Sequence, residues 1–206
     1  MRRSFVLLAG ISWLGRLRHL VWVNDLDLGG GYLVNAGIHG VDAGLWIAGG
    51  RPVSATGSSR QVAKHNGDSR DAYSITYQYE DGLIHNHRGE HIRNTHGFKC
   101  DCMAWGDAGY AEISYNGKAW LRGNKGRYVG GEVKSLYRAG IEYNLSKFEK
   151  AIRQKNYEND TLQRGVDTNL AVILGREAGM RNNLLTMDEM IKENRKIEFD
   201  TTGLKT

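Results

Sequence analysis

The first 50 residues change from a strand-like to a helical spacing of apolar side chains. Residues 17–24 alternate between two faces, as a strand does, and the glycines at 29–31 break this alternation. The next apolar positions recur every three or four residues, which is the period of a helix with one buried face; they are Val34, Ile38, Val41 and Leu45. Gly49, Gly50 and Pro52 end this predicted helix.

The second region, residues 52–123, has the pattern of successive strands. Tyr73, Ile75, Tyr77 and Tyr79 alternate with more polar residues. The dipeptides at 81–82 (Asp-Gly) and 116–117 (Asn-Gly) stand between alternating runs. Such dipeptides favour hairpins, because a type I′ turn needs residues that accept a positive φ. This region therefore predicts an antiparallel sheet.

The third region is helical. Apolar stripes at 141–152 and 162–174 predict two helices, and Thr186 with Glu189 forms a capping box that begins a third. Residues 196–200 have the pattern of a last strand. Strands followed by helices predict an α+β fold: an open-faced, largely antiparallel β-sheet with helices packed on one face. The 206 residues suit a single domain.

Composition and charge exclude some classes of function. The 28 basic and 23 acidic side chains leave a net charge of +5 that is spread along the chain, so we expect no nucleic-acid binding. The apolar run within residues 1–15 is too short to span a bilayer and no small-x-small cleavage site follows, so we expect no membrane partner. Cys100 and Cys102 lie too close in sequence for an easy disulfide, which suits a cytoplasmic protein.

A polar stripe on the first predicted helix is the main candidate for chemistry. Asn35, His39, Asp42 and Trp46 fall on one side of this helix, just after the glycine run. A histidine with a carboxylate one turn later is a proton-transfer pair, in which Asp42 orients the imidazole. The alternative is purely structural: Asn35 caps the helix and His39 is a hydrogen-bonded interface residue.

The segment GGGYLVNAGIHGVDAGLWIAGGRPVSATG (residues 29–57) resembles a motif of the Gfo/Idh/MocA oxidoreductase family. Its glycine run is followed by the histidine, the aspartate three residues later, and then tryptophan, glycine and proline-valine. FVLLAGISWLGRLRHL (residues 5–20) is similar to the family's junction between its dinucleotide-binding domain and its second domain. The segments NLSKFEKAIRQ, NDTLQRGVDTNLAVILGREAG and LLTMDEMIKEN are similar to its C-terminal helices. The resemblance thus covers nearly the whole chain.

The resemblance implies a role for each residue of the stripe. In this family the second domain closes the substrate pocket and builds the oligomer interface. His39 matches the catalytic histidine, which exchanges a proton with the substrate hydroxyl, and would lie in a ligand pocket. Asn35 stands where many members have an aspartate; an amide can hold a sugar hydroxyl but cannot take its proton. The candidate site residues are therefore His39, Asn35 and Asp42.

The family's dinucleotide-binding half has no counterpart in this sequence. No G-x-G-x-x-G opens a helix after a strand, and Arg51, not lysine, precedes Pro52. We expect no cofactor site in this chain, although NAD or NADP would be expected for a full-length relative. The chain is then a truncated gene product, a separate subunit, or a domain with another use. Residues 1–15 look like a remnant of the junction, which favours truncation.

A second constellation consists of histidines that alternate along one predicted strand. His85, His87 and His91 would share a face with Arg93, a geometry that can bind zinc or a similar ion. Alternatively these are solvent-facing or interface side chains, and Gly89 introduces a bulge that spoils their alignment.

Three functions remain open. The first is a substrate-binding and oligomerisation domain that binds a carbohydrate or polyol-like molecule near His39, forms a homo-oligomer through its sheet face, and is not a competent dehydrogenase alone. The second is a stand-alone metal-dependent hydrolase or lyase that uses His85, His87 and His91 as ligands and His39 as acid or base. The third is an interaction module whose open sheet pairs with another copy or with a dinucleotide-binding subunit.

Overall fold

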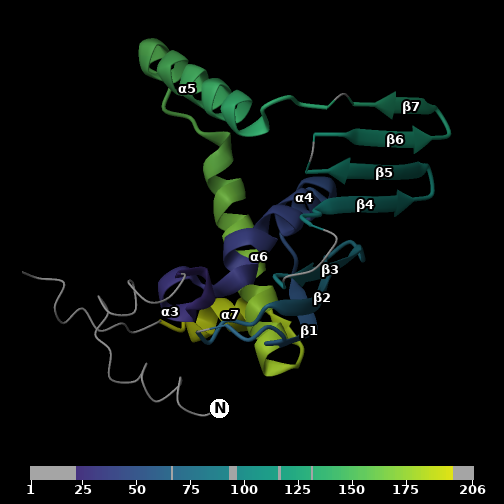
Figure 1. Ribbon diagram of the computed structural model, residues 1–206. Coiled ribbons are helices and arrows are strands. Elements are labelled where there is room, and N and C mark those ends of the chain that lie inside the picture. Colours follow the sequence, from purple (N-terminus) through teal and green to yellow (C-terminus); the bar gives the residue numbers. More distant parts are fainter. Residues whose placement is uncertain (1–21, 66, 93–96, 116, 131, 197–206) are drawn as a thin grey trace, which may run out of the picture. The chain divides into compact units, whose positions relative to one another are not determined.

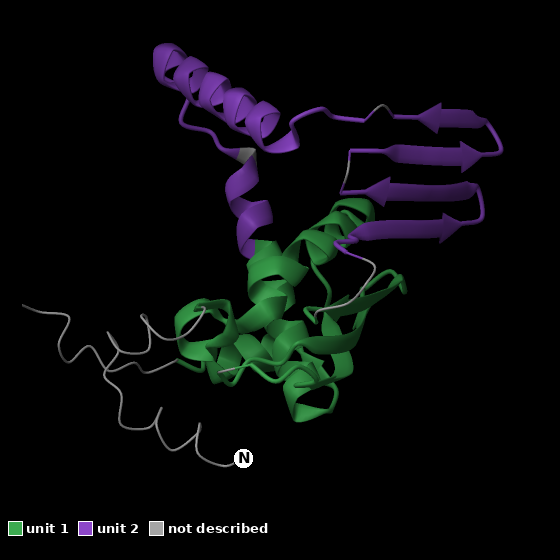
Figure 2. Ribbon diagram, in the orientation of Figure 1, with its two compact units in different colours: residues 1–95, 167–206 green, residues 96–166 purple. Residues whose placement is uncertain are grey.

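A computed structural model describes residues 22–65, 67–92, 97–115, 117–130 and 132–196 (Figure 1). The chain divides into two compact units (Figure 2): unit 1 comprises residues 1–95 and 167–206, and unit 2 comprises residues 96–166. The predicted junction at residues 1–15 and residues 197–200 of the predicted last strand lie outside the described residues. The described end of the first predicted strand is the 3₁₀ helix η1 (Trp22–Asn24), so the strand prediction is wrong for these residues.

Unit 1 is built on a four-stranded antiparallel sheet. Its order is β3 (Ile84–Glu90), β2 (Ala72–Gln78), β1 (Ser54–Arg60) and β8 (Leu185–Thr186). The alternation along β2 is confirmed, because Tyr73, Ile75 and Tyr77 are buried and Ser74 and Gln78 are exposed. The predicted hairpin between β2 and β3 is also confirmed: Gly82 has a φ of 87°, and the Leu83 amide donates to Asp81 Oδ1 at 3.0 Å.

The helices of unit 1 contribute most of the remaining core. They are α3 (Leu26–Gly29), a π-helical turn η2 (Leu33–Gly37), α4 (Ile38–Ala48), α6 (Asp160–Arg181), which begins in unit 2, and α7 (Met187–Glu193). One apolar cluster joins α4, α6, α7 and the sheet; it includes Val41, Leu45, Ile75, Val172, Leu174 and Met190. The predicted capping box is present, since the Glu189 amide donates to Thr186 Oγ1 and the Thr186 amide to Glu189 Oε2.

Unit 2 contains a second antiparallel sheet and one long helix. The strands follow chain order as a meander: β4 (Asp101–Gly106), β5 (Gly109–Ser114), β6 (Ala119–Gly123) and β7 (Gly126–Val129). α5 (Leu136–Gln154) is the first helix predicted in the third region. Its apolar stripe, however, is exposed rather than buried, and 59–65% of each side chain is accessible at Ile141, Leu145, Phe148 and Ile152.

The predicted fold class is confirmed, because the chain is α+β and both of its sheets are antiparallel. The alternating pattern of residues 52–123 predicted the strands but did not show that they belong to two separate sheets. The structure assigns β1–β3 to one sheet and β4–β7 to another, and it places all residues of the apolar core cluster in unit 1.

Candidate active site

The predicted sharp turn at the glycine run is present and has a local cause. Asp25 caps the short helix α3, because its buried Oδ1 accepts the Asp27 and Leu28 amides at 3.0 and 3.1 Å. Gly30 and Gly31 then adopt φ values of 73° and 83°, which favour glycine. At Gly31 a Cβ would also lie 2.8 Å from Leu26 Cδ2. The chain can therefore reverse within two residues and start the helix that carries the candidate residues.

The start of this helix is held from two sides. The buried Arg176 of α6 donates from Nη1 to the Gly30 carbonyl at 3.1 Å and pairs with Glu177 at 3.0 Å. The Tyr32 amide donates to Ser69 Oγ at 3.1 Å. Sequence analysis did not identify Arg176. The sequence did contain a sign of it, because Arg176 and Glu177 are adjacent opposite charges in an otherwise apolar segment.

Asn35 lies inside the π-helical turn Leu33–Gly37, one turn before His39. It is therefore not a helix cap, and that part of the structural alternative is wrong. A π-turn widens the helix by one residue per turn, and such turns are frequent at functional sites. Asn35 is partly buried and His39 is exposed. Residues four apart on a helix lie on the same side, so the amide and the imidazole project from one side of this helix.

Asp42 has a partner that the sequence did not predict. Its Oδ1 accepts a hydrogen bond of 2.6 Å from the hydroxyl of Thr168, a buried residue of α6. The carboxylate therefore links the helix that carries His39 to α6, a role that the spacing of residues 35–46 could not reveal. Trp46, the last residue of the stripe, is largely exposed.

The opposite face of α4 packs on the two histidines of β3. Gly37, Gly40 and Gly44 present no side chain there, and a Cβ on Gly40 would lie 3.3 Å from His87 Cε1. A Cβ on Gly44 would overlap the His85 ring. Burial, reinforced by the nearby His85, lowers the pKa of His87 to about 4, and burial also lowers the pKa of His85. Both imidazoles are therefore neutral at pH 7 and act as packing groups beneath the helix.

The predicted three-histidine metal site is not formed. His91 lies after the end of β3 and stacks on Tyr32, with ring centroids 5.4 Å apart and planes at 11°. Within the described ranges, no three His, Cys, Asp or Glu side chains are placed to hold a metal ion. Arg93, the fourth residue of that prediction, lies outside these ranges.

The glycine bend does not fit a nicotinamide dinucleotide. A phosphate-binding loop needs free amides at a helix start and an open approach for the pyrophosphate. Here the Tyr32 amide is bonded to Ser69, and Gly31 packs against Leu26. The element before the bend is the short helix α3 rather than a strand. The described residues thus give no support for a dinucleotide site at this position.

Neither of two hollows on the described surface includes Asn35, His39 or Asp42. One, of about 460 Å³, lies in unit 1 beside α7, where Arg181, Glu189 and Glu193 contribute to its wall. The other, of about 440 Å³, lies in unit 2 on the sheet β4–β7. His39 is instead exposed on the outer side of its helix.

Comparison with known proteins gives a consistent picture. A family model described as the GFO/IDH/MocA C-terminal domain matches residues 9–112, just over half of the chain. No curated protein matches the sequence. No helix among the described residues has both the length and the apolar character needed to cross a membrane.

Solved structures share this fold at low sequence identity. An oxidoreductase domain protein from Kribbella flavida has a TM-score of 0.69 and 14% identity over 82% of this chain and 53% of its own. An Agrobacterium radiobacter oxidoreductase, in complex with NAD+, L-tartaric acid and magnesium, has a TM-score of 0.62 and 13% identity (78% and 50% covered). The aldose-aldose oxidoreductase of Caulobacter crescentus, complexed with glycerol, has a TM-score of 0.62 and 14% identity over 80% of this chain and 50% of its own. The chain spans about half the length of each.

Proposed function

Because this chain belongs to the Gfo/Idh/MocA family through its C-terminal domain, we propose that it is the substrate-binding and oligomerisation part of a sugar or polyol oxidoreductase. The matched segment contains the whole glycine bend and the helix that follows it. Two structural relatives are oxidoreductases crystallised with hydroxylated compounds, tartaric acid and glycerol. A hydroxyl-bearing substrate is therefore the natural ligand class to test.

His39 is the residue to which we assign proton exchange with the substrate hydroxyl. The observation that carries this assignment is an exposed imidazole on a helix held by Arg176 at its start and by Thr168 along its length. A fixed support of this kind orients a group that must meet a substrate. Asn35, one turn earlier, holds a neighbouring hydroxyl through its amide, and Asp42 positions the helix.

We place nicotinamide binding outside this chain. NAD or NADP would accept the hydride in the complete enzyme, and the glycine bend described above does not fit it. The partner is then a dinucleotide-binding domain or subunit, and the chain alone is not a competent dehydrogenase. The raised pKa of both Cys100 and Cys102, caused mainly by burial, favours unreactive thiols and suits a cytoplasmic location.

The site assignment is tested by following the histidine ring protons in NMR titrations with myo-inositol and with glycerol. The His39 signal, identified by its absence in His39→Ala, should shift saturably. Asn35→Ala should weaken binding about fivefold, because one hydrogen bond contributes about 1 kcal/mol. His91→Ala is the matched control, since His91 lies after the end of β3 and stacks on Tyr32. A saturable shift that is confined to His91 would disprove the assignment.

Cofactor binding is tested separately by calorimetric titration of NADH and NADPH into the 206-residue protein. We expect no micromolar binding of either dinucleotide. Micromolar affinity would show that this chain holds a nicotinamide site, and it would overturn the proposal that the cofactor binds outside the chain. The role proposed for His39 would be unaffected.

Homo-oligomerisation through a sheet face is the second part of the proposal. In unit 2 Leu121 of β6 and Tyr128 of β7 are paired in the strand register, so they lie on one face of the sheet, the face opposite to Trp120, and both are exposed. Exposed apolar patches of this kind mark association surfaces. Light scattering across a hundredfold concentration range should detect an oligomer that Leu121→Lys dissociates. A strictly monomeric wild-type protein would refute this part.

A further inference from the structure

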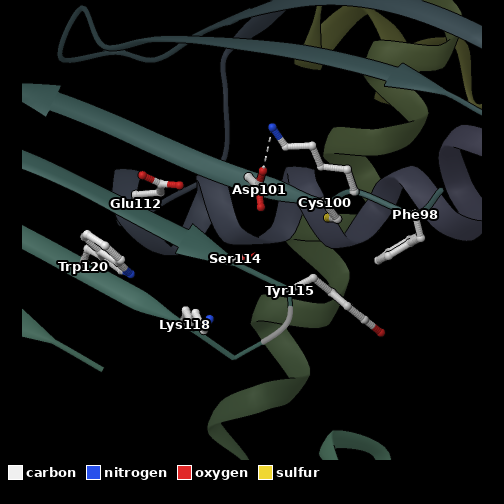
Figure 3. Close-up of a pocket in the computed structure, with 9 residues that line it drawn as sticks. Phe98, Cys100, Asp101, Glu112, Ser114, Tyr115, Lys118 and Trp120 are labelled. Atoms are coloured by element: carbon white, nitrogen blue, oxygen red, sulfur yellow. Dashed lines mark ion pairs between the residues drawn. The ribbon is translucent and has the colours of Figure 1, made fainter. Parts of the chain in front are cut away.

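The hollow of unit 2 lies on the sheet, where β4 begins and β5 ends (Figure 3). Its volume of about 440 Å³ is within the range of small-molecule sites, about 300–1,000 Å³. Directly opposite residues of antiparallel strands share a face. The register pairs Asp101 with Ser114 and Glu112 with Trp120, so these four side chains project from one side of the sheet.

The charged groups of this hollow balance one another. Two carboxylates, Asp101 and Glu112, are matched by two ammonium groups, Lys99 and Lys118. Lys99 Nζ lies 3.2 Å from Asp101 Oδ2, and the Asp101 side chain is only 17% exposed. A site with no net charge favours a neutral ligand over an anion such as a sugar phosphate. Its carboxylates accept and its ammonium and hydroxyl groups donate, which matches alcohol groups that do both.

Aromatic rings border the same hollow. Trp120 is 41% exposed and Phe98 is 71% exposed. Phe98 meets Tyr115 edge to face at 5.3 Å, and Tyr115 in turn donates to the Tyr137 hydroxyl at 3.3 Å. Tyr115 is therefore fixed by α5, while the larger ring of Trp120 offers an accessible surface. The C–H face of a sugar or cyclitol ring can cover such a surface while its hydroxyls reach the polar groups.

We propose that this hollow is a second binding site, for a neutral sugar or cyclic polyol, in which Trp120 stacks on the ring and Asp101, Glu112 and Lys118 bind hydroxyls. The site lies wholly within unit 2. It contains none of the candidate active-site residues and does not depend on the function proposed for His39.

The test follows the tryptophan indole N–H signals by NMR, and the affinity of each variant by calorimetry, during titrations with D-glucose and with myo-inositol. The Trp120 signal should shift saturably in the wild-type protein. Trp120→Ala should weaken binding about tenfold, as expected for loss of a stacking contact of about 1.4 kcal/mol, and Trp120→Phe should restore most of it. Glu112→Gln should weaken binding about fivefold, because a charge-assisted hydrogen bond becomes a neutral one.

Trp105→Ala is the matched control, because Trp105 lies on the same face of the same sheet but does not line the hollow. It should leave sugar affinity unchanged. Equal weakening by Trp105→Ala, tighter binding of glucose 6-phosphate than of glucose, or no saturable Trp120 shift would overturn the proposal. A Trp120 shift that follows protein concentration rather than sugar would show an interface between copies instead. His39→Ala should not affect the Trp120 response, so the two sites can fail separately.

Discussion

The two units of this protein have the same amphipathic patterning but differ in what that patterning buries. In unit 1 the apolar positions of α4, α6 and the sheet meet in one core. In unit 2 none of the described residues is buried, although α5 and the four strands carry regular apolar stripes. Periodicity therefore predicts which face of an element is apolar, and it does not predict whether anything covers that face.

The polar contacts also differ between the units: those of unit 1 join distant parts of the chain, and those along α5 are local. Unit 1 is joined by bonds between residues far apart in sequence, such as Thr168 with Asp42 and Arg176 with Gly30. The ion pairs along α5 are local: Arg138 with Glu142 and Glu149 with Arg153, each four residues apart. Exposed local pairs contribute little to stability. Unit 1 should therefore unfold as a cooperative body and unit 2 should be the less stable part.

The largest expected effect is the loss of a core side chain from unit 1. Ile75 is almost completely buried, whereas Ile113 on β5 is 39% exposed. Ile75→Ala should lower the free energy of unfolding by about 2–5 kcal/mol, because it leaves a cavity. Ile113→Ala should cost less than about 1 kcal/mol, because its side chain is already in contact with water. Urea denaturation of both variants measures the difference, and similar losses would show that unit 2 has a core of its own in solution.

The next effect is a loss of stability in mild acid that is confined to unit 1. The folded-state pKa of His87 is about 4 against an ordinary value of 6.5, so the unfolded chain binds a proton first as the pH falls. Stability should therefore be complete above pH 6.5 and should decrease toward pH 4. The loss from His87 alone should reach about 2 kcal/mol at pH 5.

Few other groups face this pair of imidazoles, which makes the pH prediction specific. The face of α4 opposite them consists of glycines, and Tyr77 of β2, 5.2 Å from His85 between ring centroids, has its pKa raised by burial and stays neutral. His87→Gln should remove most of the decrease between pH 6.5 and 5. Residues 97–166 contain no histidine, so the amide exchange of these residues is an internal control. An equal acid response in both units would exclude His87 as the cause.

A glycine-to-alanine comparison gives effects of opposite sign in the two units. Gly44 in α4 faces the His85 ring, whereas Gly140 in α5 has no atom within 4 Å of a Cβ. Gly44→Ala should destabilise by about 1–3 kcal/mol through overpacking. Gly140→Ala should stabilise by about 0.5–1 kcal/mol, because alanine favours the helix. The thermal midpoints of both variants report this, and a Gly44→Ala, His85→Ala double variant should recover part of the loss.

The sequence predicted those parts of the fold that depend on neighbouring residues. The capping box at Thr186 and Glu189, the turn at Gly82 and the alternation along β2 each follow from local chemistry, and all are present. The glycine bend and the helix after it could likewise be predicted, because Gly30 and Gly31 need positive φ values. The π-helical turn around Asn35 has no such local marker.

The unpredicted features depend on contacts between residues distant in the chain. Asp42 accepts a hydrogen bond from Thr168, which is 126 residues away, and its spacing of three residues from His39 could not reveal this contact. Side chains alternate between the two faces of a strand, and this alternation correctly placed His85 and His87 on one face. However, β3 ends at Glu90, before His91. The face of α4 that covers these imidazoles could be identified only once the sheet was in place.

The smallest expected effect concerns the link between α6 and the helix that carries His39. Thr168→Val keeps the shape of the side chain but removes the hydroxyl that donates to Asp42, so it should lower stability by about 1–3 kcal/mol, with values near 1 if water reaches the carboxylate. If the link positions His39, the same variant should weaken myo-inositol binding at His39 by about twofold or more, an effect at the low end of a lost hydrogen bond. Thr168→Ser retains the donor and should behave like the wild-type protein in both measurements. A Thr168→Val variant that loses stability without any change in the His39 titration would mean that α6 supports the fold of unit 1 but does not orient the imidazole. In that case α4 would be held in place by packing alone, through core residues such as Val41 and Leu45.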